Sequence, residues 1–190
     1  MKPEEVRKQA DRLVTQLEQW HQRQDRGVMA RLRRGLSETT RSEADMVLGQ
    51  YFGPLAVGHP VFQAVTGCFA LHPFPSAPNI GNFGETMRGV MGDKKMREEK
   101  ETHARFRRLL ACSDSAEVCQ HIRQAVRLTK SHQSPVAINY RKLFEDLWWW
   151  NDCTKVEWAK AYWSVPADAT DFSLAGVGAP VEEEPVPMPE

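Results

Sequence analysis

Glycine-rich phosphate loops, chelating histidine pairs and nucleophile elbows are all missing from this 190-residue sequence. Without G-x-G-x-x-G, a Walker loop, H-E-x-x-H or G-x-S-x-G, the common dinucleotide, nucleoside-triphosphate, zinc-protease and hydrolase chemistries have no local basis. The six histidines are scattered, and Glu98, Glu99 and Glu101 lie among lysines, which favours a solvated charged face over an acid–base pair. We therefore expect no enzymatic activity, no cofactor and no metal site.

Long apolar runs and paired cysteines are also missing. No stretch approaches the ~20 apolar residues needed to span a bilayer, and the charged start MKPEEVRKQADRL has no apolar signal core. We expect a cytoplasmic protein that does not contact a membrane. The cysteines, Cys68, Cys112, Cys119 and Cys153, lie 44, 7 and 34 residues apart, which matches no paired zinc-ligand spacing. Buried, reduced thiols are the better interpretation.

No segment shows the alternation of apolar and polar residues that is typical of a strand. Apolar residues instead recur at helical spacing, which predicts an all-α protein. The first predicted helix covers 4–21, with inward positions Val6, Ala10, Leu13, Val14, Leu17 and Trp20. Further helices are predicted at 28–36, from 42 through 51, from 60, around 85–90, three times within 103–150, and from 154. In the middle helix of 103–150 the inward positions are Val118, Ile122, Ala125, Val126 and Thr129.

Capping residues predict where three of these helices begin. The predicted starts are Ser42 with Asp45, Ser134 before Pro135, and Thr154 with Glu157. The last helix should bury Trp158, Ala159, Tyr162 and Trp163, and at least two of the three tryptophans at 148–150 should lie in the core.

Charge is distributed unevenly along a chain whose formal net charge is zero. Residues 42–87 contain no lysine or arginine, whereas 88–142 hold 13 bases and 6 acids. Residues 72–84 contain three prolines and two glycines and must form a connection. We expect two small helical bundles, 1–84 and 85–164, joined by this Pro/Gly-rich connection. The acidic segment 165–190 lacks apolar periodicity, which predicts a disordered tail.

Arginine clusters on the predicted helices are the strongest functional signal. A single charged helix face is usually only solvated, but guanidinium groups suit phosphate contacts, and several clusters fall on helices expected to pack together. The candidate nucleic-acid-binding residues are Arg33, Arg34, Arg105, Arg108, Arg123, Arg127, Lys130 and Arg141. Arg123, Arg127 and Lys130 share one face of a helix whose apolar residues occupy another, so their removal should leave the core intact.

The order of short motifs resembles the small subunit of the type I-E CRISPR Cascade complex, the CasB family. The motifs are a first helix ending in Trp20, L-R-R-G at 32–35, N-F-G-E-T-M-R at 82–88, R-F-R-R-L-L at 105–110, the helix start at Pro135 and W-A-x-x-Y at 158–162. Their order and spacing across about residues 4–164 carry the resemblance.

This resemblance implies a non-catalytic helical protein that works inside a guide-RNA surveillance complex. Its implied partners are the guide RNA, the target and non-target DNA strands, the backbone and large subunits of Cascade, and a second copy arranged head to tail. By position in the motifs, it implies backbone contacts from Arg33, Arg34, Arg105, Arg108, Arg123 and Arg127.

Two other interpretations stay open at the level of the sequence. A helical protein-interaction adaptor would leave the arginines solvated and use exposed aromatic residues to meet a partner protein. An unrecognised nuclease or other enzyme would use histidines and glutamates of the central segment. Salt-sensitive retention on single-stranded DNA would argue against the first, and metal-dependent cleavage of an oligonucleotide would be needed to support the second.

Overall fold

Nine α-helices and one 3-10 helix make up the described part of the chain, which contains no strand, so the predicted all-α fold is confirmed. The computed structural model describes residues 1–73, 80–91, 96–131 and 136–164, with the backbone alone for 96–101. The predicted acidic tail at 165–190 lies outside these residues.

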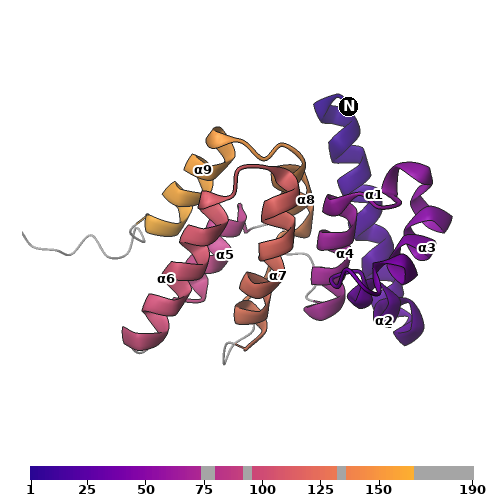
Figure 1. Cartoon of the computed structure of the whole chain (residues 1–190), viewed down its shortest axis with the longest axis horizontal. Helices are drawn as coiled ribbons and strands as arrows, with labels where there is room; N and C mark the ends of the chain where they lie inside the picture. Colours follow the sequence, from indigo (N-terminus) through magenta and orange to yellow (C-terminus); the bar gives the residue numbers. More distant parts are fainter. Residues whose placement is uncertain (74–79, 92–95, 132–135, 165–190) are drawn as a thin grey trace, which may run out of the picture.

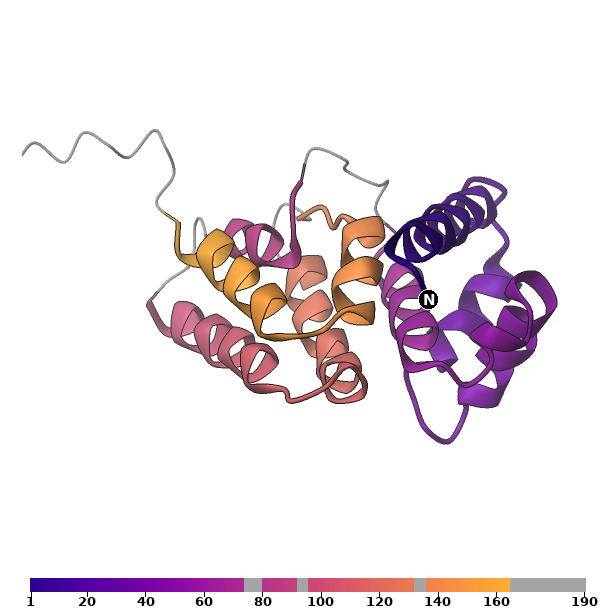
Figure 2. The ribbon, with the colours of Figure 1, turned by 90° about the horizontal axis from the view of Figure 1, so that it is seen from above.

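The helices form an elongated arrangement in which α1–α4 lie on one side, α5, α6 and α9 on the other, and α7 and α8 between them (Figure 1, Figure 2). Their bounds are α1 Pro3–Gln22, α2 Arg26–Arg34, α3 Arg41–Phe52, η1 Pro54–Ala56, α4 Pro60–Leu71, α5 Phe83–Gly89, α6 Met96–Ala111, α7 Ser115–Ser131, α8 Tyr140–Trp148 and α9 Asp152–Trp163. The limit predicted between the bundles, at 84/85, cuts through α5.

The predicted apolar stripes of α1 and α7 are confirmed. All six inward positions of α1 are buried, and so are all five of α7. Because each helix buries only one face, its charged residues stay at the surface. Buried residues from α1 through α9 belong to one contiguous hydrophobic cluster.

Helix α4 lies at the centre of this cluster. Every residue from Val61 to Ala70 is buried, and the helix packs against α2, α3, α7 and α8. A helix covered on all sides must be apolar around its whole circumference, and the sequence VFQAVTGCFA meets that requirement. Gly67 is needed here because a Cβ would lie 2.5 Å from the Leu36 side chain.

The carbonyl groups at the end of α4 are bound by side chains from both halves of the chain. The buried Tyr140 hydroxyl on α8 donates to His72 O at 2.8 Å and also lies 3.2 Å from Cys68 O. From α2, Arg33 Nε donates to Ala70 O at 3.2 Å. Cys68 O also accepts from His72 N at 2.9 Å, whereas Ala70 O and His72 O lie at the end of the helix, where carbonyl groups obtain no donor from the helix backbone.

Two of the predicted capping boxes are wrong. Helix α3 begins at Arg41, and Asp45 instead accepts from Gly58 N at 3.0 Å and from Gln63 Nε2 at 2.7 Å, which fixes the start of α4. Helix α9 begins at Asp152, because Asn151 Oδ1 accepts from Thr154 N and so takes the capping role.

The predicted start of α8 is also wrong. Ser134 and Pro135 lie outside the described residues, but 136–139 are not helical and α8 begins at Tyr140, capped by Asn139. Hydrogen bonds to distant residues hold this non-helical segment in place: His72 Nε2 donates to Val136 O at 2.9 Å, and Thr86 Oγ1 donates to Ala137 O at 3.2 Å. Tertiary contacts have overridden a local start signal.

The predicted burial of the aromatic and cysteine residues is confirmed with exceptions. Trp150 is buried and Trp148 packs partly buried against the core, whereas Trp149 is exposed. In α9, Trp158 and Tyr162 are buried but Ala159 is only half-buried and Trp163 is exposed. Three cysteines are buried thiols, but Cys153 is exposed because it lies in the first turn of α9, on the solvent side.

One carboxyl group is buried between α8 and α9. Asp146 accepts from Lys142 Nζ at 2.6 Å and from Trp158 Nε1 at 2.7 Å. Burial raises the pKa of Asp146 above its ordinary value, although the bonds from Lys142 and Trp158 oppose that rise. The carboxylate therefore serves as an acceptor for a core tryptophan and is destabilised by its own desolvation.

Replacing Tyr140 by Phe should lower the free energy of unfolding by about 1–3 kcal/mol, because the carbonyl of the buried His72, which follows α4 directly, loses its donor. Tyr51→Phe is the matched control, since Tyr51 is exposed, and it should change stability by less than about 0.5 kcal/mol. Urea unfolding of both variants gives the comparison. Equal urea midpoints for Tyr140→Phe and Tyr51→Phe would contradict the role assigned to Tyr140.

Replacing Asp146 by Asn should remove a pH dependence. The raised pKa means that the folded state binds this proton more tightly than the unfolded state, so stability falls as pH rises through the window above about pH 4. Asn keeps an acceptor for Trp158 but has no charge to desolvate. The stability of the wild type relative to Asp146→Asn should therefore decline between acidic and neutral pH in thermal unfolding. A constant difference would refute the assignment.

Candidate nucleic-acid interface

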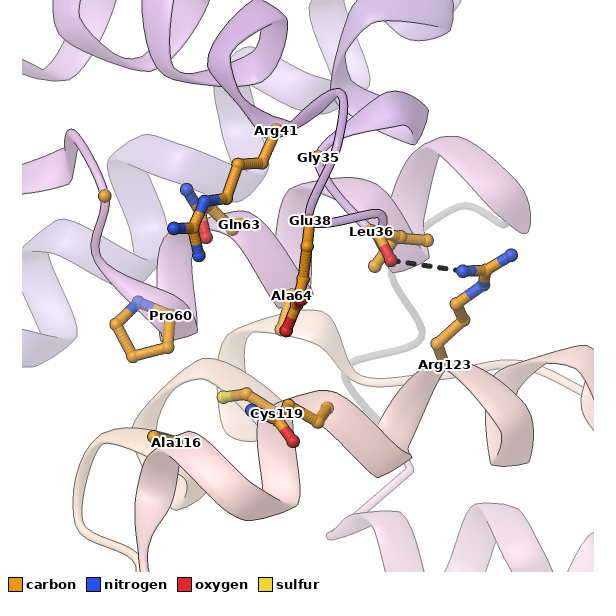
Figure 3. Close-up of a pocket in the computed structure, with 12 residues that line it drawn as sticks. Gly35, Leu36, Glu38, Arg41, Pro60, Gln63, Ala64, Ala116, Cys119 and Arg123 are labelled. Atoms are coloured by element: carbon orange, nitrogen blue, oxygen red, sulfur yellow. Dashed lines mark hydrogen bonds between the residues drawn. The ribbon is translucent and has the colours of Figure 1, made fainter.

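A cleft of about 300 Å³ lies where the α2–α3 connection and the start of α4 face α7 (Figure 3). Arg41 and Glu38 enter from the α3 side, Gln63 from α4, and Gln120 and Arg123 from α7. The cleft thus has two guanidinium groups, two amides and one carboxylate. Two positive groups and neutral amide donors suit an anionic, hydrogen-bonding ligand.

The α7 wall of the cleft continues as a basic face. Ala116, Gln120 and Arg123 line the cleft, and the helical spacing of four and three residues places Arg127 and Lys130 on the same face farther along. Arg127 and Lys130 are exposed, whereas Arg123 is half-buried. We call Arg123, Arg127 and Lys130 the α7 basic face.

Arg123 also has a structural contact. Its Nη1 donates to Leu36 O at 3.1 Å, which joins α7 to the α2–α3 connection 87 residues earlier (Figure 3). A guanidinium has five N–H donors, so this bond leaves others for a ligand. This contact argues against the expectation that Arg123 can be removed without affecting the fold; for the exposed Arg127 and Lys130 the expectation stays a prediction.

The arginines of α2 lie close to this region but are partly engaged. Arg34 forms an ion pair with Glu43, and Arg33 bonds Ala70 O. Arg33 also lines a second hollow of about 450 Å³, together with Arg26 and Asp25. Since Leu36 follows these arginines by two and three residues, the end of α2 lies beside the middle of α7.

Arg141 lies in a different environment. Its guanidinium forms salt bridges to Asp11 at 3.0 Å and Glu18 at 3.5 Å, both on α1, so its charge is compensated within the molecule. Arg105 is half-buried and Arg108 exposed on α6, which packs against α7. As a nucleic-acid contact each of these three residues stays a prediction.

Sequence reasoning missed Arg41, Gln63 and Gln120. Arg41 is the last base before the base-free segment 42–87, which is the one signal that sets it apart from an ordinary surface arginine. The two glutamines carry no sequence signal, because only the packing of α4 against α7 brings them to one cleft.

The cleft has no activated nucleophile. Its one thiol, Cys119, has its pKa raised to about 12 by burial, so it stays protonated near neutral pH and is a poor nucleophile. The arrangement can bind and position a ligand with charge and amide donors.

Replacing Arg127 and Lys130 by Ala should weaken binding of single-stranded DNA by the isolated chain uniformly across sequences. Each lost phosphate contact should reduce the magnitude of the slope of log affinity against log salt by about 0.7, because fewer counterions are released. Arg123→Ala should in addition lower stability by about 1 kcal/mol, since Leu36 O loses its donor. Binding is measured by fluorescence anisotropy at several salt concentrations.

The matched control is Lys8→Ala, an exposed residue of α1 away from the α7 basic face, which should leave the slope unchanged. If the Arg127 and Lys130 variants fold normally and keep the wild-type slope of log affinity against log salt, the binding surface lies elsewhere.

No helix among the described residues has the length and apolar character needed to cross a membrane. A family model described as CRISPR-associated protein Cse2 matches residues 28–163. The match contains α2–α9 almost completely, including the cleft and the α7 basic face. No curated protein and no solved structure matches the chain.

Proposed function

Because the chain belongs to the Cse2 family and is therefore a Cascade subunit of CRISPR defence, we propose that its basic surface holds nucleic-acid backbone during R-loop formation. The ligands are guide RNA, target DNA and the displaced strand. The observation that carries the proposal is the α7 basic face running out of a cleft that also contains Arg41. The family is one of non-catalytic structural subunits, and we propose that this chain too lacks catalytic activity.

The energetics of R-loop formation make a non-catalytic basic scaffold sufficient. Opening DNA against a guide exchanges one duplex for another of similar stability, so protein contacts worth a few kcal/mol can determine the outcome. Guanidinium and ammonium groups that bind phosphates supply such contacts without reading sequence. The arginine, lysine and glutamine side chains of the cleft and the α7 basic face can make contacts of this kind.

Contacts with other subunits and with a second copy, arranged head to tail, belong to the same proposal. Among the described residues, large apolar side chains are exposed in three regions: Met46, Tyr51, Leu55 and Val57 on α3 and just after it, Trp149 before α9 together with Val156 and Trp163 on α9, and Met1 at the start of the sequence. Exposed apolar groups of this size favour protein contacts. They are also what the competing adaptor hypothesis would use, so the nucleic-acid contacts need a separate test.

The test uses the complete complex assembled with wild-type chain or with Arg127→Ala/Lys130→Ala. Assembly should be unchanged, while the affinity for a matched target DNA should fall about tenfold, equivalent to about 1.4 kcal/mol. Chemical probing of the unpaired displaced strand should show fewer open complexes at limiting protein.

Lys8→Ala is again the control. An adaptor without nucleic-acid contacts would give full affinity for target DNA in the double variant. Failure of the complex to assemble with the double variant would likewise count against the proposal, since it would assign these side chains to a protein interface.

A further inference from the structure

Three side chains with metal-binding chemistry meet at the turn between α6 and α7, outside the set of residues assigned to the cleft. The Cys112 sulfur, a Glu117 carboxylate oxygen and a His121 ring nitrogen all lie within 4.8 Å of one another. Cys112 follows directly after α6, and Glu117 and His121 are four residues apart on one face of α7. No spacing in the sequence groups these three residues as metal ligands, because the cysteine and the histidine are nine residues apart.

Hydrogen bonds hold the residues around this cluster in place and leave ligand atoms available to a metal ion. Trp150 Nε1 donates to Cys112 O at 3.1 Å, and Asp114 Oδ1 accepts from Glu117 N at 2.9 Å. Glu117 Oε2 accepts from Ser113 N at 2.6 Å, which leaves its other oxygen for a ligand. The bond from Ser113 N is of the kind that orients a carboxylate ligand in a metal site, and the other two hold the backbone that carries the ligands.

His121 is half-buried, and among the described residues its ring nitrogens have no hydrogen-bond partner. The Cys112 thiol donates to Arg108 O at 3.2 Å, a weak bond. Glu117 and Asp114 bring negative charge close to the sulfur, and Lys155 is the nearby positive group. Negative charge therefore exceeds positive charge around the sulfur, which favours binding of a cation.

We propose that Cys112, Glu117 and His121 bind one zinc ion that joins the end of α6 to the start of α7. Thiolate, imidazole and carboxylate are the three ligand types that zinc prefers, and three protein ligands leave a fourth, tetrahedral position for water. Ligand atoms around zinc lie roughly 3.3–3.8 Å apart when the bonds are about 2.0–2.3 Å long. The cluster therefore needs to contract by about 1 Å, which rotation of the Glu117 and His121 side chains supplies.

The metal would set the angle between α6 and α7. It lies at the α6 end of the same helix that carries the α7 basic face, so it would fix that face relative to Arg105 and Arg108 on α6. This inference does not depend on nucleic-acid binding. It differs from the expectation of no metal site, which rested on missing motifs, scattered histidines and cysteine spacing.

The test is titration of the metal-free full-length chain with Co²⁺, followed by displacement with Zn²⁺. Wild type should bind one Co²⁺ with a thiolate-to-cobalt absorption band, and Zn²⁺ should abolish the band and raise the melting temperature. Cys112→Ser should lose the band. His121→Gln and Glu117→Gln should weaken binding about tenfold or more, as loss of one of three ligands requires.

Glu117→Gln retains a carbonyl that can accept from Ser113 N, and His121 is half-exposed, so both variants should fold even if the buried Cys112→Ser does not. The matched controls are Cys153→Ser and His21→Gln, which remove an exposed cysteine and an exposed histidine elsewhere and should bind metal like wild type. The proposal is overturned if wild type gives no thiolate-to-cobalt band, or if His121→Gln and Glu117→Gln bind as tightly as wild type.

Discussion

The last turn of α4 is buried where the two halves of the chain meet, and its carbonyl groups must find donors away from water. Arg33 on α2 supplies one donor and Tyr140 on α8 supplies another, so each half contributes to closing the same helix end. The hydrophobic cluster that continues from α1 to α9 depends on this junction. Removing a donor on either side would leave a buried backbone oxygen unsatisfied, which is expensive in a close-packed interior.

The same constraint explains why arginine is used at the candidate interface. Arg33 and Arg123 each give one N–H to a backbone carbonyl of the facing element and keep further donors directed elsewhere. A lysine has three donors on a single nitrogen, whereas the planar guanidinium directs five donors from three nitrogens to partners that lie farther apart. The same guanidinium groups that provide positive charge at the surface therefore also connect elements that pack together. The cleft beside α7 lies where Arg123 contacts the α2–α3 connection.

Helix α7 carries both the α7 basic face and two of the three proposed zinc ligands. One face is apolar and packs against α4, another carries Arg123, Arg127 and Lys130, and the first two turns present Glu117 and His121 towards the end of α6. The base-free segment 42–87 supplies α3 apart from Arg41, the whole of α4 and most of α5, and all three helices contribute buried residues to the core. Although the net charge of the chain is zero, helices that mainly build the core and helices that carry basic residues at the surface are different parts of the sequence. That separation suits a subunit working inside a larger assembly.

The sequence by itself determined the helical class, the inward faces of α1 and α7, and the shared basic face of α7, because helical periodicity is a local property that burial only confirms. Only the tertiary structure decided where α8 begins: His72 and Thr86 bind the carbonyl groups of Val136 and Ala137 in the non-helical segment before it, and no local signal contains those partners. It likewise decided that Arg41 and Gln63 share a cleft with Arg123, that Arg141 is paired with α1, and that Cys112 meets His121. Contacts between residues far apart in the chain depend on how packed helices are oriented, and periodicity fixes which face is buried but not which helix covers it.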